Sequence, residues 1–303
     1  MHFITMPRFI PLGFTLLLAF CLMRSSQAQE HGFSPIDAPG ATATLAIGIS
    51  PKGDIVGYYL DSSPPNSHGF LLSKGKFAPI DFPGAVSTFA TGINLTGDIV
   101  GHYLDIGSRF HGFRLSKGEF TPVDVPGSTF TFANGINPRG DIVGQYQDGY
   151  PPFKTHGFLL RKGEFTTLDF LGSASTLANG INAKGEIVGQ YQDNSPASNT
   201  HGFLLSKNVF RTIGVPEAPL TAARGINSRG EIVGHSTDTN GNQAGFLQNK
   251  SNFTAIQVPG AVLQGAVGTV ATGLNPRGDI VGYYEDSAGN LHGFLTSKKL
   301  IEP

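Results

Sequence analysis

The sequence repeats itself at intervals of 43 to 48 residues, and this repetition limits the fold more than any other feature. A Gly-Ile-Asn word, or a close relative of it, begins at Gly48, Gly92, Gly135, Gly180, Gly225 and Gly273. Each is followed by Gly-Asp/Glu-Ile-Val-Gly, then by an Asp and a variable loop, and then by His-Gly-Phe, which reads Ala-Gly-Phe at Ala244. Four strand-like segments separated by turn signals in about 45 residues are typical of one β-propeller blade.

The turn signals support this interpretation. In the second repeat, residues 88–94, 98–103, 111–116 and 120–124 are the predicted strands. The first two are joined by an Asn-x-x-Gly turn, as in Asn137-Pro138-Arg139-Gly140. The Asn side chain begins such a turn, and Gly accepts the left-handed conformation that ends it. Each repeat is therefore expected to form four antiparallel strands.

The two ends of the chain complement each other. Residues 33–37 resemble a fourth strand that has no first, second or third strand before it, whereas residues 294–297 end a set that has no fourth strand. An open solenoid would need capped ends, while closure of a ring removes both exposed edges. The sequence thus predicts an all-β, six-bladed β-propeller in which the N-terminal strand completes the last blade.

The first 28 residues are interpreted as a secretory signal peptide. Arg8 precedes a nearly continuous apolar run, residues 9–23, and small residues before Gln29 offer a cleavage site. A lipidated Cys21 is disfavoured because the bulky Phe20 precedes it. We expect a secreted protein, extracellular or periplasmic, whose propeller occupies residues 29–303 and which does not insert into a membrane after cleavage.

Composition excludes several classes of function. Cys21 is the only cysteine, so residues 29–303 contain no disulfide, thiol nucleophile or thiolate-bound zinc. The net charge of −1 gives no signature of nucleic-acid binding. Gly-x-Ser-x-Gly, His-Glu-x-x-His and phosphate-cradling glycine motifs are absent. The expectation is a monomer without a cofactor or metal.

The combination of Gly-Ile-Asn, Gly-Asp-Ile-Val-Gly and His-Gly-Phe resembles the HAF family of probable extracellular repeats, and the resemblance covers essentially all of residues 29–303. It implies export and a propeller-like array. It supplies no catalytic residues.

Repeated polar residues are interpreted as structural. One Asp follows the second strand of each repeat, and His-Gly-Phe supplies His68, His111, His156, His201 and His292. Imidazoles spaced around a wide ring cannot converge on one ion at ligand distances of about 2.0–2.1 Å, so we expect His–Asp hydrogen bonds within each blade. The carboxylates after the turn glycines, such as Asp141, and the lysines and arginines concentrated in the same turns are expected to form a solvated face.

Positions that vary between repeats are the candidates for function. The residues directly before Gly-Ile-Asn form a first ring: Ile47, Thr91, Asn134, Asn179, Arg224 and Thr272. The residues directly after Ile-Val-Gly form a second ring: Tyr58, His102, Gln145, Gln190, His235 and Tyr283. The ligand-binding candidates in these rings are Arg224, Asn134, Asn179, His102, His235, Gln145 and Gln190.

Variable loops add further candidates. Arg109, Tyr150 and Phe153 lie between the second and third strands of their repeats, and residues 259–270 form the longest connection. Exposed aromatic side chains in loops are suited to stacking on sugars or peptides.

Three functions remain open at this point. The leading hypothesis is a binding or scaffold module for an extracellular polysaccharide, peptide or protein. The alternative is a polysaccharide hydrolase or lyase with its active site at the mouth of the channel, and a purely structural surface protein is the third. Arg224, the only charge in the first ring, is the preferred site residue; an internal salt bridge with Glu217 is the competing explanation for it.

Overall fold

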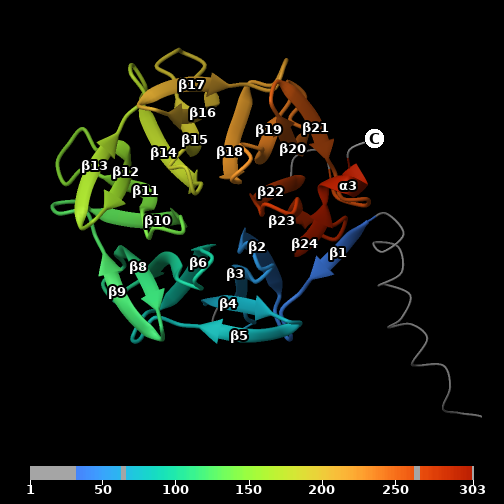
Figure 1. Cartoon of the computed structure of the whole chain (residues 1–303), viewed down its shortest axis with the longest axis horizontal. Coiled ribbons are helices and arrows are strands. Elements are labelled where there is room, and N and C mark those ends of the chain that lie inside the picture. Colours follow the sequence, from blue (N-terminus) through green and yellow to red (C-terminus); the bar gives the residue numbers. More distant parts are fainter. Residues whose placement is uncertain (1–31, 63–65, 263–266, 302–303) are drawn as a thin grey trace, which may run out of the picture.

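The computed structural model describes residues 32–62, 66–262 and 267–301. Its strands are arranged around a central axis as a β-propeller-like ring (Figure 1). The strands nearest the axis are β2 (Ala43–Ile49), β6 (Ser87–Ile93), β10 (Phe130–Ile136), β14 (Ser175–Ile181), β18 (Leu220–Ile226) and β22 (Thr269–Leu274). Next come β3 (Ile55–Leu60), β7 (Ile99–Leu104), β11 (Ile142–Gln147), β15 (Ile187–Gln192), β19 (Ile232–Thr237) and β23 (Asp279–Glu285).

The outer half of the ring completes the sheets. The third strands are β4 (Ser67–Ser73), β8 (Phe110–Ser116), β12 (Thr155–Arg161), β16 (Thr200–Ser206), β20 (Gln243–Asn249) and β24 (Leu291–Ser297). The outermost are β5 (Lys76–Ile80), β9 (Glu119–Val123), β13 (Glu164–Leu168), β17 (Val209–Ile213), β21 (Asn252–Ile256) and β1 (Phe33–Ile36). A four-residue helix, α3 (Lys298–Ile301), follows β24.

Consecutive strands pair antiparallel from the axis outward. Four of the sheets have four strands each, and one sheet has eight, from β14 to β21. Within the eight-stranded sheet, β14–β17 and β18–β21 each repeat the antiparallel order, and a single parallel pair, Thr200 with Leu220, joins β16 to β18.

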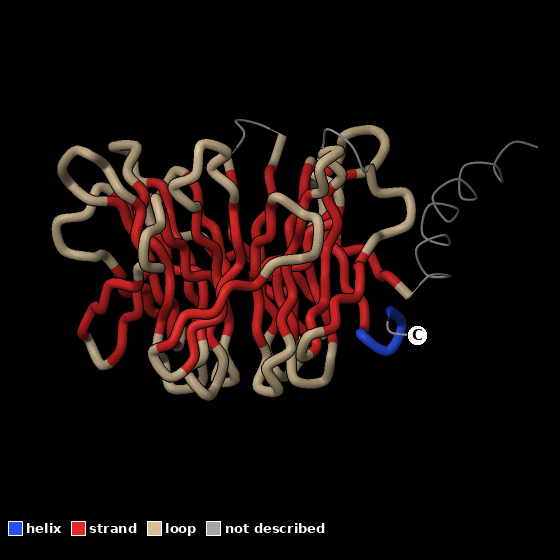
Figure 2. Tube along the Cα trace, turned by 90° about the horizontal axis from the view of Figure 1, so that it is seen from above, coloured by secondary structure: helices blue, strands red, loops and turns tan. Residues whose placement is uncertain are grey.

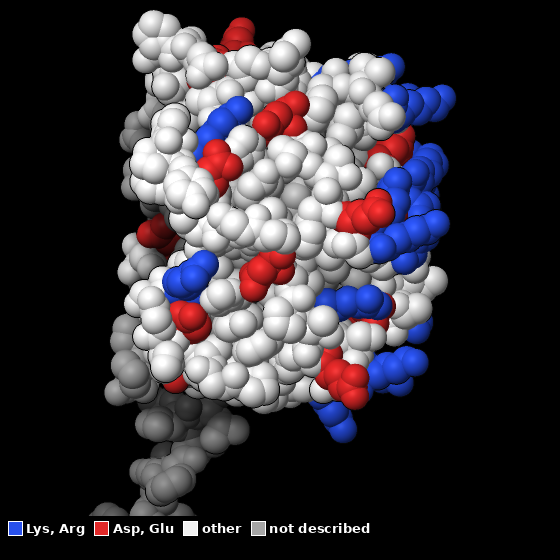
Figure 3. Space-filling model, turned by 90° about the vertical axis from the view of Figure 1, so that its left-hand side faces the viewer, with Lys and Arg blue, Asp and Glu red and all other residues white. Residues whose placement is uncertain are grey.

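The strands run along the axis, so that their connections gather on two faces (Figure 2). We call the turn face the one that carries the connections from innermost to second and from third to outermost strands, such as residues 50–54 and 74–75. The loop face carries the longer connections, such as residues 148–154. Lysine and arginine side chains gather along one edge of the disc (Figure 3), as the sequence predicts for the turn face.

The first strand closes the ring. β1 pairs antiparallel with β24, with Phe33 opposite Thr296 and Ile36 opposite Gly293. The Thr296 hydroxyl also donates to the carbonyl oxygen of Gly32 at 2.8 Å. The prediction that residues 33–37 supply the missing strand of the last sheet is therefore confirmed. The predicted signal peptide lies outside the described residues.

The core consists of separate clusters, each between two neighbouring sheets. Val56 of β3, for example, packs with Ala90, Ile99 and Phe113 of the next sheet. The phenylalanine of each His-Gly-Phe is at most 2% exposed. It lies over the glycine of Ile-Val-Gly: a Cβ atom on Gly144 would collide with the Phe132 carbonyl oxygen and the Phe158 ring. Glycine is needed there because the carbonyl oxygen of the neighbouring strand and the aromatic ring together take the space of a side chain.

The Asn-x-x-Gly turns form as predicted. The Asn137 side-chain oxygen accepts hydrogen bonds from the backbone N–H groups of Arg139 and Asp141, at 2.9 and 3.0 Å. Gly140 has a φ of 81°, the left-handed conformation that glycine adopts readily. No helix among the described residues is long and apolar enough to cross a membrane.

Candidate functional site

A cavity of about 300 Å³ lies on the axis of the ring, and we call it the axial cavity. It is lined by the whole first ring, by second-ring residues, and by two apolar side chains, Phe132 and Leu177. The innermost strands run from the loop face to the turn face, and the cavity residues precede the Ile-Asn pairs that end these strands. The axial cavity therefore belongs to the loop-face end of the channel.

Nearer the turn face the channel narrows. A smaller cavity of about 100 Å³ is lined there by the isoleucines of the Gly-Ile-Asn words and by turn prolines such as Pro138. These isoleucines are buried; Ile136, for example, is 7% exposed. Asparagines of the Gly-Ile-Asn words also line this smaller cavity, but among the described residues a charged side chain lines only the loop-face end of the channel.

A β-bulge explains why the first ring points into the cavity. In every innermost strand the register shifts between the alanine and the glycine that flank the first-ring residue, for example between Ala223 and Gly225 around Arg224. A bulge leaves its extra residue unpaired and redirects the side chain. The repeated Ala-x-Gly word thus presents one freely variable side chain per repeat to the axis.

Most members of the first ring join neighbouring sheets. The side chains of Thr91, Asn134 and Asn179 donate to the carbonyl oxygens of Ala133, Ala178 and Ala223 in the next innermost strand, at 2.7 to 2.9 Å. Thr272 closes the series with a bond to the Ala46 carbonyl oxygen at 2.9 Å. The binding candidates Asn134 and Asn179 therefore also have a structural role that their sequence position did not reveal.

Arg224 takes no part in this series. Among the described residues it makes no hydrogen bond or ion pair, and its Nε atom is buried without a partner. Glu217 is exposed in a loop and forms no ion pair with it. The internal salt bridge considered from the sequence is therefore wrong, because the carboxylate lies outside the cavity. Arg224 is a cation held toward the axis with its hydrogen-bonding capacity unused.

The second ring also contains unpaired polar atoms. His102 Nδ1, Gln190 Oε1 and His235 Nδ1 are buried without a hydrogen-bond partner, and Gln145 lines the cavity beside them. His235 does not line the cavity itself but lies behind it, at 8% exposed. Four of the seven unpaired buried side-chain atoms in the described part of the chain thus belong to the two rings. Native proteins rarely leave such groups unsatisfied.

Burial keeps the cavity's titratable groups neutral. Burial lowers the pKa of His102 to about 3, and burial together with the Arg224 charge does the same for His235. Burial and the neighbouring Tyr283 raise the pKa of Tyr58 to about 12. The lining contains no Asp or Glu among the described residues, so Arg224 is its one charge at neutral pH.

An aromatic cluster lies beside the cavity, and sequence reasoning missed most of it. Phe89 packs on Tyr58 and His102, with ring centroids 4.9 and 4.8 Å apart. His102 also contacts Phe132 at 4.4 Å, and Phe110 packs on Phe132 at 5.0 Å. Phe89 and Phe132 stand two residues before first-ring positions, and this spacing is the signal that places them near the axis.

The three loop candidates do not line the cavity. Tyr150 is 83% and Phe153 56% exposed in the 148–154 loop. The backbone N–H of Arg109 donates to Asp105 Oδ1 at 2.8 Å, and its guanidinium donates to the Ser128 carbonyl oxygen at 3.3 Å. These three binding candidates therefore lie apart from the ring candidates that line the axial cavity. Residues 263–266 of the longest connection lie outside the described part.

The repeated His residues bridge carboxylates within each sheet, as predicted. His156 Nδ1 lies 2.9 Å from Asp169, and its Nε2 lies 3.1 Å from Asp148 Oδ2. His201 makes only the second of these contacts, with Asp193 at 3.0 Å, because Gly214 stands where the other His-bearing repeats have Asp. The described residues contain no group of His, Cys, Asp or Glu arranged to hold a metal ion.

This difference between repeats gives a matched test of the structural role. Replacing His156 by Ala should lower the free energy of unfolding by about 1–3 kcal/mol, because it leaves partly buried carboxylates without their partner. His201→Ala should cost less, since only one carboxylate loses a contact. Chemical denaturation measures both values, and equal losses would contradict the bridging role.

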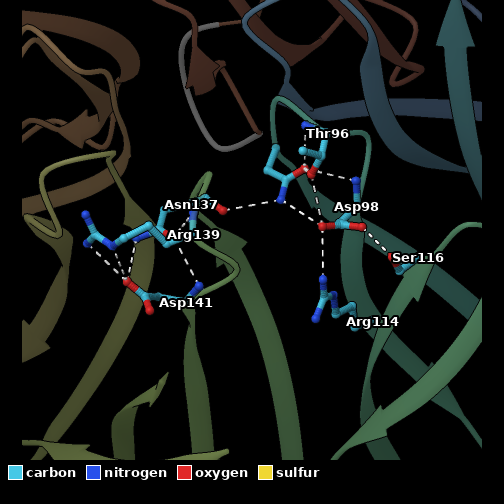
Figure 4. Close-up of polar contacts among 8 residues, drawn as sticks. Thr96, Asp98, Arg114, Ser116, Asn137, Arg139 and Asp141 are labelled. Carbon is cyan, nitrogen blue, oxygen red and sulfur yellow. Dashed lines mark hydrogen bonds and ion pairs between the residues drawn. The ribbon is translucent and has the colours of Figure 1, made fainter. Parts of the chain in front are cut away.

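Two of the six carboxylates after the turn glycines are buried rather than solvated as expected. Asp141 and Glu231 are each 5% exposed. Asn137 Nδ2 donates to Asp141 Oδ2 at 2.8 Å. At Asp98, burial opposes ionisation, but hydrogen bonds from Ser116, Asn94 and Arg114 outweigh it and lower the pKa to about 2. Asp98 and Asp141 each accept a hydrogen bond from the asparagine that begins their turn, and so stabilise it (Figure 4). The sequence alone did not reveal this structural role.

The neutral histidines predict an acid-sensitive fold. The unfolded chain takes up protons on His102 and His235 near pH 6.5, whereas the folded protein resists until about pH 3. Stability should therefore fall as the pH drops through this window, by at most about 1.4 kcal/mol per pH unit for each histidine. Replacing both by Gln, the residue at positions 145 and 190, should flatten this dependence in urea unfolding. Parallel curves for variant and parent would contradict the burial argument.

Comparison with known proteins supports the fold. No protein-family model matches the sequence, and a search of curated proteins finds no match. Among solved structures, the chain is similar to SapL1 lectin in complex with alpha methyl fucoside, with a TM-score of 0.56 and 11% identity over 85% of this chain and 94% of that one.

Two further structures are similar to a comparable degree. A mutant of AofleA from Arthrobotrys oligospora has a TM-score of 0.54 and 11% identity over 84% of this chain and 83% of that one. A mutant of Aleuria aurantia lectin in complex with Fucα1-6GlcNAc has a TM-score of 0.53 and 12% identity over 84% and 91%. At such identities the likeness establishes a shared β-propeller fold.

Proposed function

We propose that this chain is a secreted propeller that binds a glycan in the axial cavity. The observation that carries the proposal is the set of buried, unpaired polar atoms on three residues that line the cavity, Arg224, His102 and Gln190. An unsatisfied buried donor or acceptor costs about 1–3 kcal/mol, and a ligand that pairs with it recovers that cost. Convergent polar groups beside aromatic rings are typical of ligand pockets.

The chemistry of the lining favours a sugar. Apolar rings such as Phe132 offer a surface for the C–H face of a pyranose, while Gln145, Gln190 and Asn134 offer hydrogen-bonding groups for hydroxyls. Arg224 adds a single cation without a carboxylate nearby, so a glycan carrying a carboxylate is the preferred ligand. The similar propellers SapL1 and Aleuria aurantia lectin are recorded with fucose-containing ligands, which is in keeping with a glycan.

The proposal includes the finer architecture and the location. The eight-stranded sheet is taken as two blades joined by one residue pair, which gives six blades and matches the six sequence repeats. The resemblance of the repeat words to the HAF-type extracellular repeats and the apolar N-terminal segment are the observations that support secretion.

Catalysis is the weaker alternative. Glycoside hydrolysis commonly uses two carboxylates, and the described lining contains none. Elimination by a lyase needs a base, and efficient general bases have a pKa near the working pH. Burial holds the pKa of His102 near 3 and that of Tyr58 near 12, so neither group is tuned for proton transfer near neutrality.

The test is a screen of protein beginning at Gln29 against neutral, uronic-acid and amino-sugar glycans, scored for both binding and cleavage. Binding of a carboxylate-bearing glycan without cleavage supports the proposal. Cleavage would make the protein an enzyme, and binding to no glycan would overturn the proposal.

A further inference from the structure

A second cavity lies on the turn face and shares no lining residue with the axial cavity. It has a volume of about 590 Å³ and lies between the sheet of β6–β9 and the sheet of β10–β13. We call it the basic cleft, because its lining includes Arg114 of β8, Arg139 of the turn before β11, and Arg161 and Lys162 at the end of β12. The one carboxylate in the lining is Asp141.

Comparison of the six repeats shows that the positive charges of Arg114 and Arg161 occur only at the basic cleft. The position of Arg114 is leucine in every other repeat: Leu71, Leu159, Leu204, Leu247 and Leu295. The position of Arg161 is serine or asparagine in every other repeat: Ser73, Ser116, Ser206, Asn249 and Ser297. Both departures from the repeat occur in neighbouring sheets and line the same cleft. The cleft has cations at the positions of Arg114, Arg139, Arg161 and Lys162. Between any other two neighbouring repeats, the same four positions supply no more than two cations.

The carboxylates nearby do not use up these cations. Arg114 Nη2 lies 3.0 Å from Asp98 Oδ2, on one sheet, and Arg139 Nη2 lies 3.1 Å from Asp141 Oδ2, on the next (Figure 4). Arg161 must share Asp141 with Arg139, at 3.3 Å. Four cations therefore face two carboxylates.

Arg114 also retains an unused donor. Its Nε atom is buried and has no hydrogen-bond partner, although the side chain as a whole is 39% exposed. A leucine at this position would leave no donor to satisfy. The guanidinium is thus held by Asp98 through Nη2, while the side chain stays partly exposed in the lining of the cleft.

We propose that the basic cleft binds the sulfate or phosphate esters of an anionic saccharide. Such esters present several strong acceptor oxygens, which suit the planar forks of more than one arginine. The volume of the cleft is several times that of one inorganic anion, so the ester belongs to a larger molecule. This proposal is independent of the axial cavity, which has different residues and opens on the other face.

The repeats supply the test variant. Arg114→Leu with Arg161→Ser restores the residues of the other repeats, so the fold should be retained. The control is Arg229→Thr with Arg277→Thr, which removes two cations from the same face outside the cleft and introduces the residue that Thr96 already provides at this turn position. Binding of a sulfated oligosaccharide, of inorganic phosphate and of a DNA oligonucleotide is measured by calorimetry, and cooperative unfolding is recorded for each variant.

We expect the parent and the control pair to bind the sulfated oligosaccharide alike, and the Arg114→Leu/Arg161→Ser pair to bind it at least tenfold more weakly. Binding should weaken as salt is added, because the charges of the cleft are only partly buried. Equal losses in both pairs would mean diffuse attraction to the whole face and would overturn the proposal. So would binding of inorganic phosphate as tight as that of the oligosaccharide, preference for DNA, or no binding by the parent.

Discussion

Deletion of residues 33–37 should abolish cooperative unfolding and cause aggregation. β1 pairs along its whole length with β24, and its two inward side chains, Phe33 and Ile36, are each 5% exposed. Burying a side chain of this kind contributes about 1.5–3 kcal/mol, and the deletion also removes Asp37, whose hydrogen bond raises the pKa of His292. The two side chains alone account for about 3–6 kcal/mol, which is a large part of the net stability of a domain, about 5–15 kcal/mol.

The deletion also exposes an edge. Without β1, the outward side of β24 presents unpaired N–H and C=O groups, which pair with other chains. Size-exclusion chromatography and chemical denaturation measure the two effects. A matched control is Ser34→Ala with Pro35→Ala, because both side chains are exposed on the same strand; it should unfold like the parent. A deletion variant that stays monomeric and unfolds cooperatively would show that β1 is dispensable.

Replacing Arg224 by Thr should weaken glycan binding at least tenfold and leave the fold intact. The loss of a charge-assisted hydrogen bond of about 1.5–3 kcal/mol corresponds to at least a tenfold rise in Kd. Threonine is the first-ring residue at positions 91 and 272, where its hydroxyl bonds the carbonyl oxygen of the next innermost strand. The variant should therefore be at least as stable as the parent.

The control for this variant is Arg229→Thr, which removes the same charge from the turn face. It should bind the glycan as the parent does. If Arg224→Thr unfolds at lower denaturant concentration yet binds the glycan normally in its folded fraction, Arg224 serves to fill the channel and the proposed site is wrong.

The architecture was largely predictable because the residues that form its turns and strands recur in nearly every repeat. The Asn-x-x-Gly turns, the strand boundaries to within about one residue and the His–Asp contacts follow from residues that recur in nearly every unit. Closure followed from an orphan strand at one end and a missing strand at the other. Local hydrogen bonding and hydrophobic burial decide these features, and both depend on residues close together in the repeat.

The site was only partly predictable. Variation between repeats identified the first ring and Arg224, but the bulge that aims this residue at the axis depends on pairing with the second strand. Which atoms remain unpaired depends on distances between sheets. Asn179 reaches the Ala223 carbonyl oxygen and is satisfied, whereas Arg224, one repeat later, is not. The placement of Tyr150 and Phe153 outside the cavity was likewise fixed by the loop path.

The sequence by itself determined the repeating unit, its turns and the strand that closes the ring, because each is encoded by residues that contact their neighbours in the chain or in the same sheet. Only the tertiary structure decided that Arg224 remains without a partner and that Arg114 and Arg161 line the same cleft between two sheets. Arg114, Arg161 and Arg224 lie 47 to 110 positions apart in the sequence. Their surroundings are set by the packing of neighbouring sheets around a common axis, and the sequence of a single repeat does not contain that information.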